Sequence, residues 1–189
     1  MFSGEYSIFR DLETKRLFLK SISHEDDVFF FKQYSSDEVN RYLYDAEPCS
    51  SVAEAVEWID FYPEEEPGNQ HRWVLILKEN GEKIGTCGFH CWNREQHEAE
   101  LGYDLWPTYW KHGYIQEAVG RIIDFAAKEM GVKTVFAHIS VNNAASIRTA
   151  LKLCFVRSGK QYDEEYHGQK YLHDIYVKRL SEDAKKGCN

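Results

Sequence analysis

The segment Glu98–Met130 constrains the fold of this chain of 189 residues most strongly, because its hydrophobic period changes halfway along. It begins as Glu-Ala-Glu-Leu-Gly-Tyr-Asp-Leu, which alternates in polarity as a half-buried strand does. After Trp106-Pro107 and a short polar loop with Gly113, apolar residues return at helical spacing, at 115, 118, 119, 122 and 126. The segment therefore predicts a strand, a loop and a helix whose first amide groups can hold a phosphate.

The rest of the chain predicts helices and strands around this segment. Before it we expect a strand over 12–22, a helix capped by Ser23, a helical turn near 37–43, a helix over 52–62, and antiparallel strands over 73–77 and 83–91 joined at Asn80-Gly81. After it we expect a strand over 134–140, a helix from Asn142 or Asn143, and a hairpin of 155–163 with 169–179.

The order of these elements predicts an α/β fold. Its central mixed sheet is mostly antiparallel, with helices on both faces. The strand, helix and strand over 98–140 form a parallel pair, because such a connection has room to cross over the sheet. We expect one domain over 1–180 and a polar tail over 181–189.

Charge and hydropathy restrict the function. The net charge of −8 and the pI near 5.5 disfavour nucleic acid and weakly favour a cationic substrate. No apolar run reaches the ~18–20 residues that a membrane span needs, and the first residues lack an export pattern. We therefore expect a cytoplasmic protein that binds neither nucleic acid nor membrane.

A metal site is not expected, although Cys87, His90, Cys91 and His97 lie close together in the sequence. On a regular strand residues 87 and 91 lie ~13 Å apart, which is too far for two ligands of one tetrahedral ion.

A second motif follows the predicted crossover strand. Asn143 and Ser146 are three residues apart and lie on one face at the start of a helix. This helix and the one after Gly113 flank adjacent parallel strands, so their N-termini should face the same edge of the sheet.

With both motifs, the chain resembles the GNAT superfamily of acyl-CoA-dependent N-acyltransferases, and within it the branch that contains the ribosomal-protein alanine N-acetyltransferases. The resemblance covers Glu13 to Arg179. The family's pyrophosphate loop has Gln or Arg, two residues, Gly, one residue, then Gly or Ala, and here it reads Trp110-Lys-His-Gly-Tyr-Ile115. Lys111 stands where many relatives have a second Gly, and Cys154 stands where Gly usually precedes Phe155.

The resemblance implies that acetyl-CoA binds in a V between two splayed parallel strands, the one that ends at Leu105 and the one over 134–140. Backbone groups of Asp104, Leu105 and Trp106 would pair with the pantetheine arm. The amides of Lys111, His112, Gly113, Tyr114 and Ile115 would hold the pyrophosphate, and Asn143 and Ser146 would also contact the cofactor. Lys111 and His112 add positive charge there, although both are equally well explained as surface residues.

The reaction needs a neutral amine, and Glu100 is our candidate for positioning or deprotonating it. Alternation places Glu98, Glu100 and Asp104 on one face of the strand. Simple exposure of this face to solvent would also explain the three carboxylates. His90 and Tyr103 are candidates for contact with the acceptor, and Tyr103 and His138 are lesser candidates for the acid. His90 is also explained as a structural histidine.

Ser146 is our candidate for donating a hydrogen bond to the leaving thiolate, and Asn143 for ordering the cofactor or the acceptor. Both are also explained as helix-capping residues. Cys154 lies among apolar residues and is a poor nucleophile candidate, so we expect direct transfer without an acyl-enzyme.

The expected activity is transfer of an acetyl group from acetyl-CoA to a primary amine, either a protein N-terminal α-amine or a small amine, by a monomer or homodimer. The departures at Trp110, Lys111 and Ile115 leave a second hypothesis open: a catalytically silent module that binds acyl-CoA or a partner. A nucleotide-dependent enzyme is disfavoured, because no Gly-Lys-Ser/Thr follows the loop.

Overall fold

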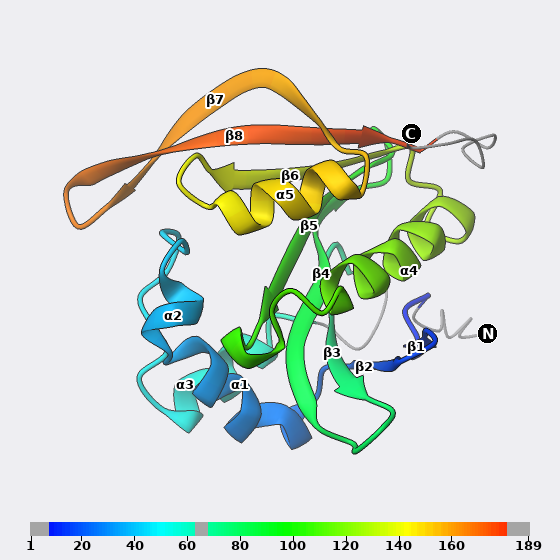
Figure 1. Cartoon of the computed structure of the whole chain (residues 1–189), viewed down its shortest axis with the longest axis vertical. Coiled ribbons are helices and arrows are strands. Elements are labelled where there is room, and N and C mark those ends of the chain that lie inside the picture. Colours follow the sequence, from blue (N-terminus) through cyan, green and yellow to red (C-terminus); the bar gives the residue numbers. More distant parts are fainter. Residues whose placement is uncertain (1–7, 63–67, 181–189) are drawn as a thin grey trace, which may run out of the picture.

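The computed structural model describes residues 8–62 and 68–180, and it is built on one mixed sheet of eight strands (Figure 1). The order across the sheet is β1-β2-β3-β4-β5-β6-β8-β7. The strands are β1 (Leu12–Glu13), β2 (Leu17–Ser21), β3 (His71–Leu77), β4 (Lys83–Asn93), β5 (Glu98–Leu105), β6 (Thr134–Ser140), β7 (Val156–Tyr166) and β8 (Gln169–Arg179).

Helices cover both faces of this sheet, as the sequence predicts. They are α1 (Asp27–Tyr34), α2 (Asp37–Asn40), α3 (Val52–Ile59), α4 (Tyr114–Lys128) and α5 (Ala144–Lys152), with short 3-10 turns η1 (His24–Asp26) and η2 (Pro107–Tyr109). None of the helices within 8–62 and 68–180 is long and apolar enough to cross a membrane. The predicted tail over 181–189 lies outside the described residues.

The prediction of one strand over 12–22 is wrong. The chain reverses between β1 and β2, which pair antiparallel with Leu12 opposite Leu19. Thr14 closes the reversal, because its N–H donates to the Leu17 carbonyl at 2.9 Å and its hydroxyl accepts from the Leu17 N–H at 3.0 Å. Alternation of apolar residues continues through such a tight turn, so hydrophobic period alone does not reveal it.

The other elements follow the sequence closely. Ser23 forms a capping box, but with η1, and α1 starts after it. Asn80-Gly81 lies in the turn between β3 and β4, with Gly81 at φ 74°. The strand predicted over 83–91 continues to Asn93, with an irregular register after His90.

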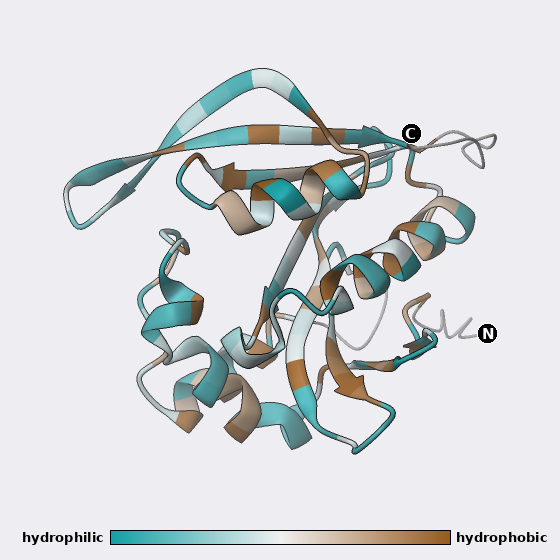
Figure 2. Ribbon diagram, in the orientation of Figure 1, coloured by the Kyte–Doolittle hydropathy of each residue, from teal (hydrophilic) through white to brown (hydrophobic). Residues whose placement is uncertain are grey.

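Two hydrophobic clusters hold the faces of the sheet. On one face α4 packs Ala118, Val119 and Ile122 against residues of β3 to β6, in a core that includes Trp73, Leu101 and Val135. On the other face α1 and α3 bring Phe30 and Ile59 against Val74. Figure 2 shows that the β7–β8 hairpin is largely hydrophilic near its turn.

The parallel pair β5 and β6 separates partway along its length. Only Glu98, Ala99 and Glu100 of β5 pair with β6, opposite Thr134, Val135 and Phe136. Beyond this point β5 continues to pair with β4, and β6 pairs with β8 along its whole length. The splayed pair that the sequence predicts is therefore present, and the carboxyl ends of both strands border an opening.

Candidate active site

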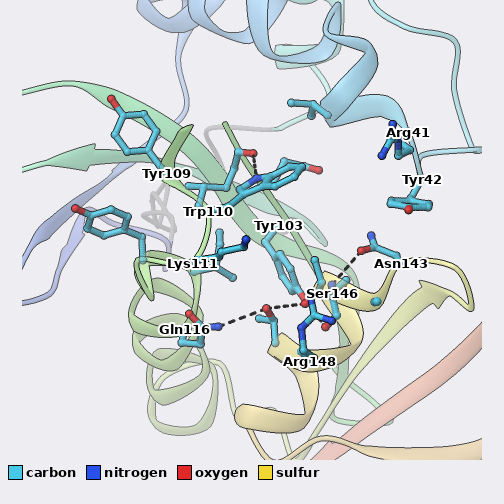
Figure 3. Close-up of a pocket in the computed structure, with 18 of the residues that line it drawn as sticks. Arg41, Tyr42, Tyr103, Tyr109, Trp110, Lys111, Gln116, Asn143, Ser146 and Arg148 are labelled. Carbon is cyan, nitrogen blue, oxygen red and sulfur yellow. Dashed lines mark hydrogen bonds between the residues drawn. The ribbon is translucent and has the colours of Figure 1, made fainter. Parts of the chain in front are cut away.

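A cavity of about 550 Å³ lies where the N-termini of α4 and α5 meet the carboxyl end of β5 (Figure 3). Eight of the ten residues predicted to bind the cofactor line it. They are Asp104, Leu105, Lys111, Gly113, Tyr114, Ile115, Asn143 and Ser146. Trp106 and His112 lie outside its lining. Both motifs that the sequence singles out therefore reach one cavity, which we call the donor cavity.

The loop before α4 leaves the first amides of that helix open. Gly113 is the N-cap of α4 at φ 79°, a left-handed conformation that glycine adopts without strain. No described side chain accepts a hydrogen bond as an N-cap of α4. The N–H groups of Tyr114 and Ile115 therefore have no capping side chain among the described residues and can donate to a ligand. The positive end of the dipole of a helix of 15 residues lies at the same place. Such a terminus suits a phosphate group.

Arg16, which lies between β1 and β2, holds this loop in place, a role that no local sequence pattern predicts. Its Nη1 donates to the His112 carbonyl at 3.0 Å, and its Nε donates to Glu117 Oε2 at 2.7 Å. Its guanidinium also lies 4.4 Å from the centre of the Tyr114 ring. These contacts join the backbone of the loop before Gly113 to two side chains of α4 after it.

Two residues stand where the GNAT pattern usually has glycine, and both have a left-handed backbone conformation. Lys111 has φ 67° and Cys154 has φ 63°. For a residue with a Cβ this conformation costs roughly 1–2 kcal/mol relative to the right-handed one. The loop therefore keeps the backbone path that glycine normally provides, at some cost in stability.

Basic side chains surround the donor cavity although the whole chain is acidic. Arg41, Lys111, Arg148 and Lys152 line it, against the carboxylates of Glu38 and Asp104. Arg148 and Lys152 are four residues apart on α5, so they share one face of that helix. Their spacing was visible in the sequence, but their position beside the loop of α4 depends on how α4 and α5 pack.

The backbone at the end of β5 is partly engaged within the chain. The Trp106 N–H donates to the Ile84 carbonyl at 3.0 Å, so it faces β4 and not the cavity. The Leu105 carbonyl accepts from the indole Nε1 of Trp110 at 2.8 Å. Trp110 thereby ties the loop back to the strand, in the place where the family pattern has a polar side chain.

Asn143, Ser146 and Tyr103 form a polar group at the start of α5 (Figure 3). The Asn143 side chain caps the helix by accepting from the Ser146 N–H at 3.0 Å. The Ser146 hydroxyl lies 2.8 Å from the Tyr103 hydroxyl, across the opening between β5 and β6. Burial raises the pKa of Tyr103 to about 12, while its contact with Ser146 opposes that rise, so the phenol keeps its proton at neutral pH.

A second cavity, of about 420 Å³, adjoins the first, and we call it the acceptor cavity. Tyr103, Asp104, Asn143 and Ser146 line both cavities. The acceptor cavity also receives the predicted residues Glu100 and His90, which the sheet places directly opposite each other on β5 and β4. Its other carboxylates are Asp45 and Glu164, which form no ion pair with a described residue.

Glu100 meets a histidine from the neighbouring parallel strand. Its Oε1 lies 3.2 Å from Nδ1 of His138, and the two side chains are 25% and 30% exposed. Glu100 and Phe136 are the last pair before the strands separate, so this contact lies at the apex of the opening. The sequence marked His138 only as a lesser acid candidate, because no local pattern links it to Glu100.

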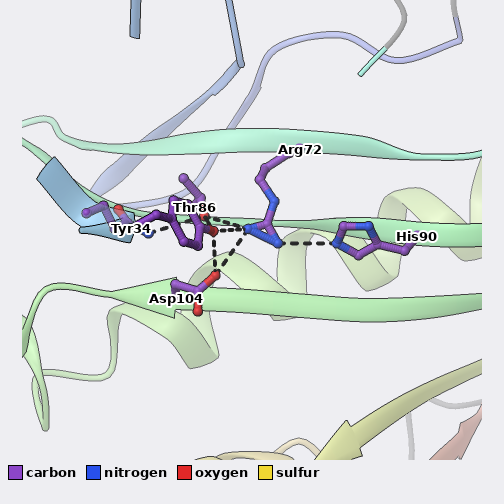
Figure 4. A network of polar contacts seen from close by, with 6 residues as sticks. Tyr34, Arg72, Thr86, His90 and Asp104 are labelled. Atoms are coloured by element: carbon purple, nitrogen blue, oxygen red, sulfur yellow. Dashed lines mark hydrogen bonds and ion pairs between the residues drawn. The ribbon is translucent and has the colours of Figure 1, made fainter. Parts of the chain in front are cut away.

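Beneath the acceptor cavity lies a buried network of polar side chains (Figure 4). The guanidinium of Arg72 donates to the Tyr34 hydroxyl, to Thr86 Oγ1 at 3.0 Å and to Asp104 Oδ2 at 3.1 Å. Tyr34 also donates to Asp104 Oδ2 at 2.7 Å. Burial raises the pKa of Asp104, and the charge of Arg72 opposes that rise.

His90 joins this network through its Nε2, 3.2 Å from Nη2 of Arg72. Because arginine can only donate, Nε2 of His90 is the acceptor and the ring is neutral. Burial lowers the pKa of His90 to about 4, and the nearby Arg72 charge acts in the same direction. His90 thus lines the acceptor cavity and is also held as a structural histidine.

Within residues 8–62 and 68–180, no three His, Cys, Asp or Glu side chains come together as a metal-binding group. Cys87 and Cys91 are free thiols, the first buried and the second exposed.

Comparison with known sequences and structures identifies the family of this chain. A model of the "Acetyltransferase (GNAT) domain" family matches residues 16–156. The uncharacterized N-acetyltransferase YoaA of Bacillus subtilis is 32% identical over 174 residues, which cover 89% of this chain and 96% of that protein. The uncharacterized N-acetyltransferase p20 of Bacillus licheniformis is 32% identical over 167 residues, which cover 88% and 93%.

Two solved structures share the fold at low identity. RimL, a ribosomal L7/L12 α-N-protein acetyltransferase in complex with coenzyme A, superposes with a TM-score of 0.82 at 15% identity, over 90% of this chain and 98% of RimL. Spermidine N-acetyltransferase from Vibrio cholerae, in complex with CoA and spermine, gives 0.76 at 18%, over 86% and 95%. With its family model, two relatives above 30% identity and this fold, the chain belongs to the GNAT family of acetyltransferases.

Proposed function

We propose that this chain transfers an acetyl group from acetyl-CoA directly to a primary amine, with the thioester held at the opening between β5 and β6. The observation that carries the proposal is the opposite charge of two cavities that meet there. The donor cavity has four basic residues and an uncapped helix N-terminus, which suit a polyanionic cofactor. The acceptor cavity has carboxylates from three elements, which suit a cationic amine.

The cofactor contacts follow from the loop and the strand. The amides near Gly113 would hold the pyrophosphate of acetyl-CoA. The positive charges of Lys111, Arg148 and Lys152 would neutralise the pyrophosphate and the third phosphate group of the cofactor. The free edge of β5 after Glu100 would lie along the pantetheine arm, because β6 no longer pairs with it there. The thioester would then end near Tyr103 and Ser146.

The chemistry requires loss of a proton from the amine and protonation of the leaving thiolate. Glu100 is our proposed group for positioning or deprotonating the amine, since it faces the acceptor cavity. The Ser146 hydroxyl, bonded to the protonated Tyr103, is our proposed donor to the thiolate. The amine attacks the thioester carbonyl directly, and no acyl-enzyme is formed.

The acceptor in this proposal is a protein N-terminal α-amine or a small amine. A protein α-amine has a pKa near ~8, so little driving force is needed to deprotonate it, whereas a lysine amine near ~10.4 needs more. The acceptors in the titles of RimL and the spermidine enzyme, a protein N-terminus and a polyamine, are both primary amines. They support the class without choosing between its members.

Two measurements test the proposal together. Coenzyme A is added to the protein, and the shift in Tm is compared with that caused by ATP. Thiol release from acetyl-CoA is then measured with a panel of N-terminal peptides and small amines. We expect a rise in Tm with CoA alone and amine-dependent thiol release. A rise in Tm without release from any amine would instead identify a silent acyl-CoA-binding module, and equal stabilisation by ATP and CoA would refute the donor assignment.

A further inference from the structure

We propose that His138 is a further catalytic residue, whose Nε2 receives the proton of the acceptor amine while Glu100 acts as a positioning residue on Nδ1. This inference rests on the proposed N-acetyltransferase function and deepens the role of its acceptor cavity. It divides between two side chains a task that the sequence assigned to Glu100 alone.

The first support is the placement of the pair. Nδ1 of His138 lies 3.2 Å from Glu100 Oε1, at the last paired position before β5 and β6 separate. The two atoms form an ion-pair contact, in which the charge of the carboxylate favours a proton on the Nδ1 side of the ring. No described residue forms a hydrogen bond with Nε2. Because His138 lines the acceptor cavity, Nε2 is available to an amine there.

The second support comes from the other two histidines of the cavity, since Nε2 of His90 is engaged by Arg72 and His173 is buried. Nε2 of His90 accepts from Arg72 at 3.2 Å. His173 is 6% exposed, and its Nδ1 lies 2.8 Å from the Tyr171 carbonyl. His138 is more accessible, and its ring contacts two aromatic rings, Tyr162 edge-on at 4.9 Å and Phe136 at 5.4 Å between centroids. Among the cavity histidines, His138 is therefore the one placed for proton transfer.

The third support is the type of side chain, because histidine is the residue that most often takes up a proton in acid–base catalysis. A base is most effective when its pKa lies close to the working pH, because it is then both unprotonated and basic enough. The charged and titratable groups that share the cavity with His138 and Glu100 are Tyr42, Tyr44, Asp45, Arg72, His90, Cys91, Tyr103, Asp104, Tyr162, Glu164 and His173, with Tyr162 against the His138 ring.

The proton balance is simple. The acceptor enters as an ammonium group and loses one proton to Nε2 of His138, which passes it to solvent. The neutral nitrogen then forms a bond to the thioester carbonyl carbon, and the carbon–sulfur bond breaks. The thiolate gains a proton from the Ser146 hydroxyl, which is replenished by Tyr103, and the second proton lost by the nitrogen replaces the one that these hydroxyls gave up. The products are an amide, coenzyme A and one proton.

The test uses His138→Asn, which keeps a donor toward Glu100 but removes the basic nitrogen, and His138→Gln as a second variant. We expect kcat to fall by roughly 10²–10⁴, with an unchanged Kd for CoA and without the acidic limb of the pH–rate profile. In His138→Ala, added imidazole should restore part of kcat. Glu100→Gln should lower kcat less and keep an acidic limb, because the basic nitrogen is still present.

A matched control is His24→Asn, since Nε2 of His24 lies 2.7 Å from Asp60 on the surface and outside both cavities. This control should keep wild-type kcat. The proposal is overturned if the Asn and Gln variants at 138 keep kcat within about threefold and retain the acidic limb. Loss of that limb in Glu100→Gln alone would make Glu100 the base. If wild-type protein releases no thiol with any amine, the proposed function fails, and that result is distinct from the failure of His138.

Discussion

The guanidinium of Arg72 lies 3.1 Å from the carboxylate of Asp104, and both side chains are nearly enclosed, at 7% and 11% exposure. The pair lies beneath the place where the two cavities meet, since Asp104 lines both of them. A charge buried in this way depends on its partner, because removing either one leaves the other without compensation.

Asp104→Asn should therefore destabilise the protein strongly. We expect the free energy of unfolding to fall by about 3–5 kcal/mol, because the charge of Arg72 remains buried while its counter-charge is lost. Urea unfolding monitored by fluorescence measures the change. The double variant Arg72→Met/Asp104→Leu is the control and should lose less than the single variant. An equal or greater loss in the double variant would contradict the argument.

Gly113→Val should weaken the donor site through the backbone. A Cβ at this position would meet Arg16 Nη2 at 3.6 Å, an ordinary contact, so space is not the obstacle. The obstacle is φ 79°, which a β-branched residue avoids. We expect the KM for acetyl-CoA to rise about tenfold, which corresponds to ~1.4 kcal/mol.

Gly120→Ala is the matched control for this change, within the same helix. A Cβ there would meet no atom within 4 Å, and the residue is in the interior of α4. It should raise the free energy of unfolding by about 0.5–1 kcal/mol and leave the KM unchanged. If the KM for acetyl-CoA is unchanged in Gly113→Val too, the proposed phosphate site at this loop is wrong.

Lys111→Gly and Lys111→Ala separate the backbone strain of this residue from its charge. Both remove the ammonium group, so both should weaken CoA binding and reduce its dependence on salt. Only glycine relieves the left-handed strain at φ 67°. We expect the Gly variant to have the higher free energy of unfolding, by about 1 kcal/mol. Calorimetry with CoA and thermal unfolding of both variants supply the data, and equal stabilities would show that the loop carries no strain.

The stability of the fold should fall as the pH drops below neutrality. Burial lowers the pKa of His71 to about 3, although the charge of Asp11 opposes it, and burial lowers that of His90 to about 4. In the unfolded chain both histidines titrate near ~6.5, so below that pH the unfolded state binds more protons than the folded state. Each histidine then lowers the free energy of unfolding by up to about 1.4 kcal/mol per pH unit. This loss continues until the pH reaches the pKa that the histidine has in the folded state.

His71→Gln isolates the contribution of one of these histidines. Urea unfolding at pH 7, 6 and 5 should show a shallower loss of stability in this variant than in the wild type. Ser21→Ala is the control, since it removes the hydroxyl 3.2 Å from His71 Nε2 but keeps the buried ring. The control should keep the wild-type slope, and identical slopes in all three proteins would rule out His71 as a source.

Local sequence patterns predicted most of the fold. The meander of β3 to β5, the crossover to β6 and the helix starting after Gly113 each depend on hydrophobic period and turn residues close in sequence. Hydrophobic period did not predict the reversal between β1 and β2, because the apolar residues keep one period through the turn.

The candidate site was less accessible to sequence reasoning. Glycines and helix starts marked the donor loop, but the brace from Arg16 crosses about a hundred residues of sequence. The contact between Glu100 and His138 and the network around Arg72 also join distant elements. Such contacts depend on sheet register and on which residues face each other across strands, which no local pattern specifies.

The separation of β5 from β6 has a further consequence for ligand binding. Because β6 is bonded to β8 at every position from Thr134 to Ser140, it keeps one complete edge when its other edge is free. The opening therefore exists before the cofactor binds, and no strand pairing has to be broken to create it. An incoming cofactor meets an edge of β5 that β6 leaves unpaired. Binding free energy that would otherwise be consumed in breaking strand pairing remains available for affinity, so coenzyme A should associate without a slow conformational step.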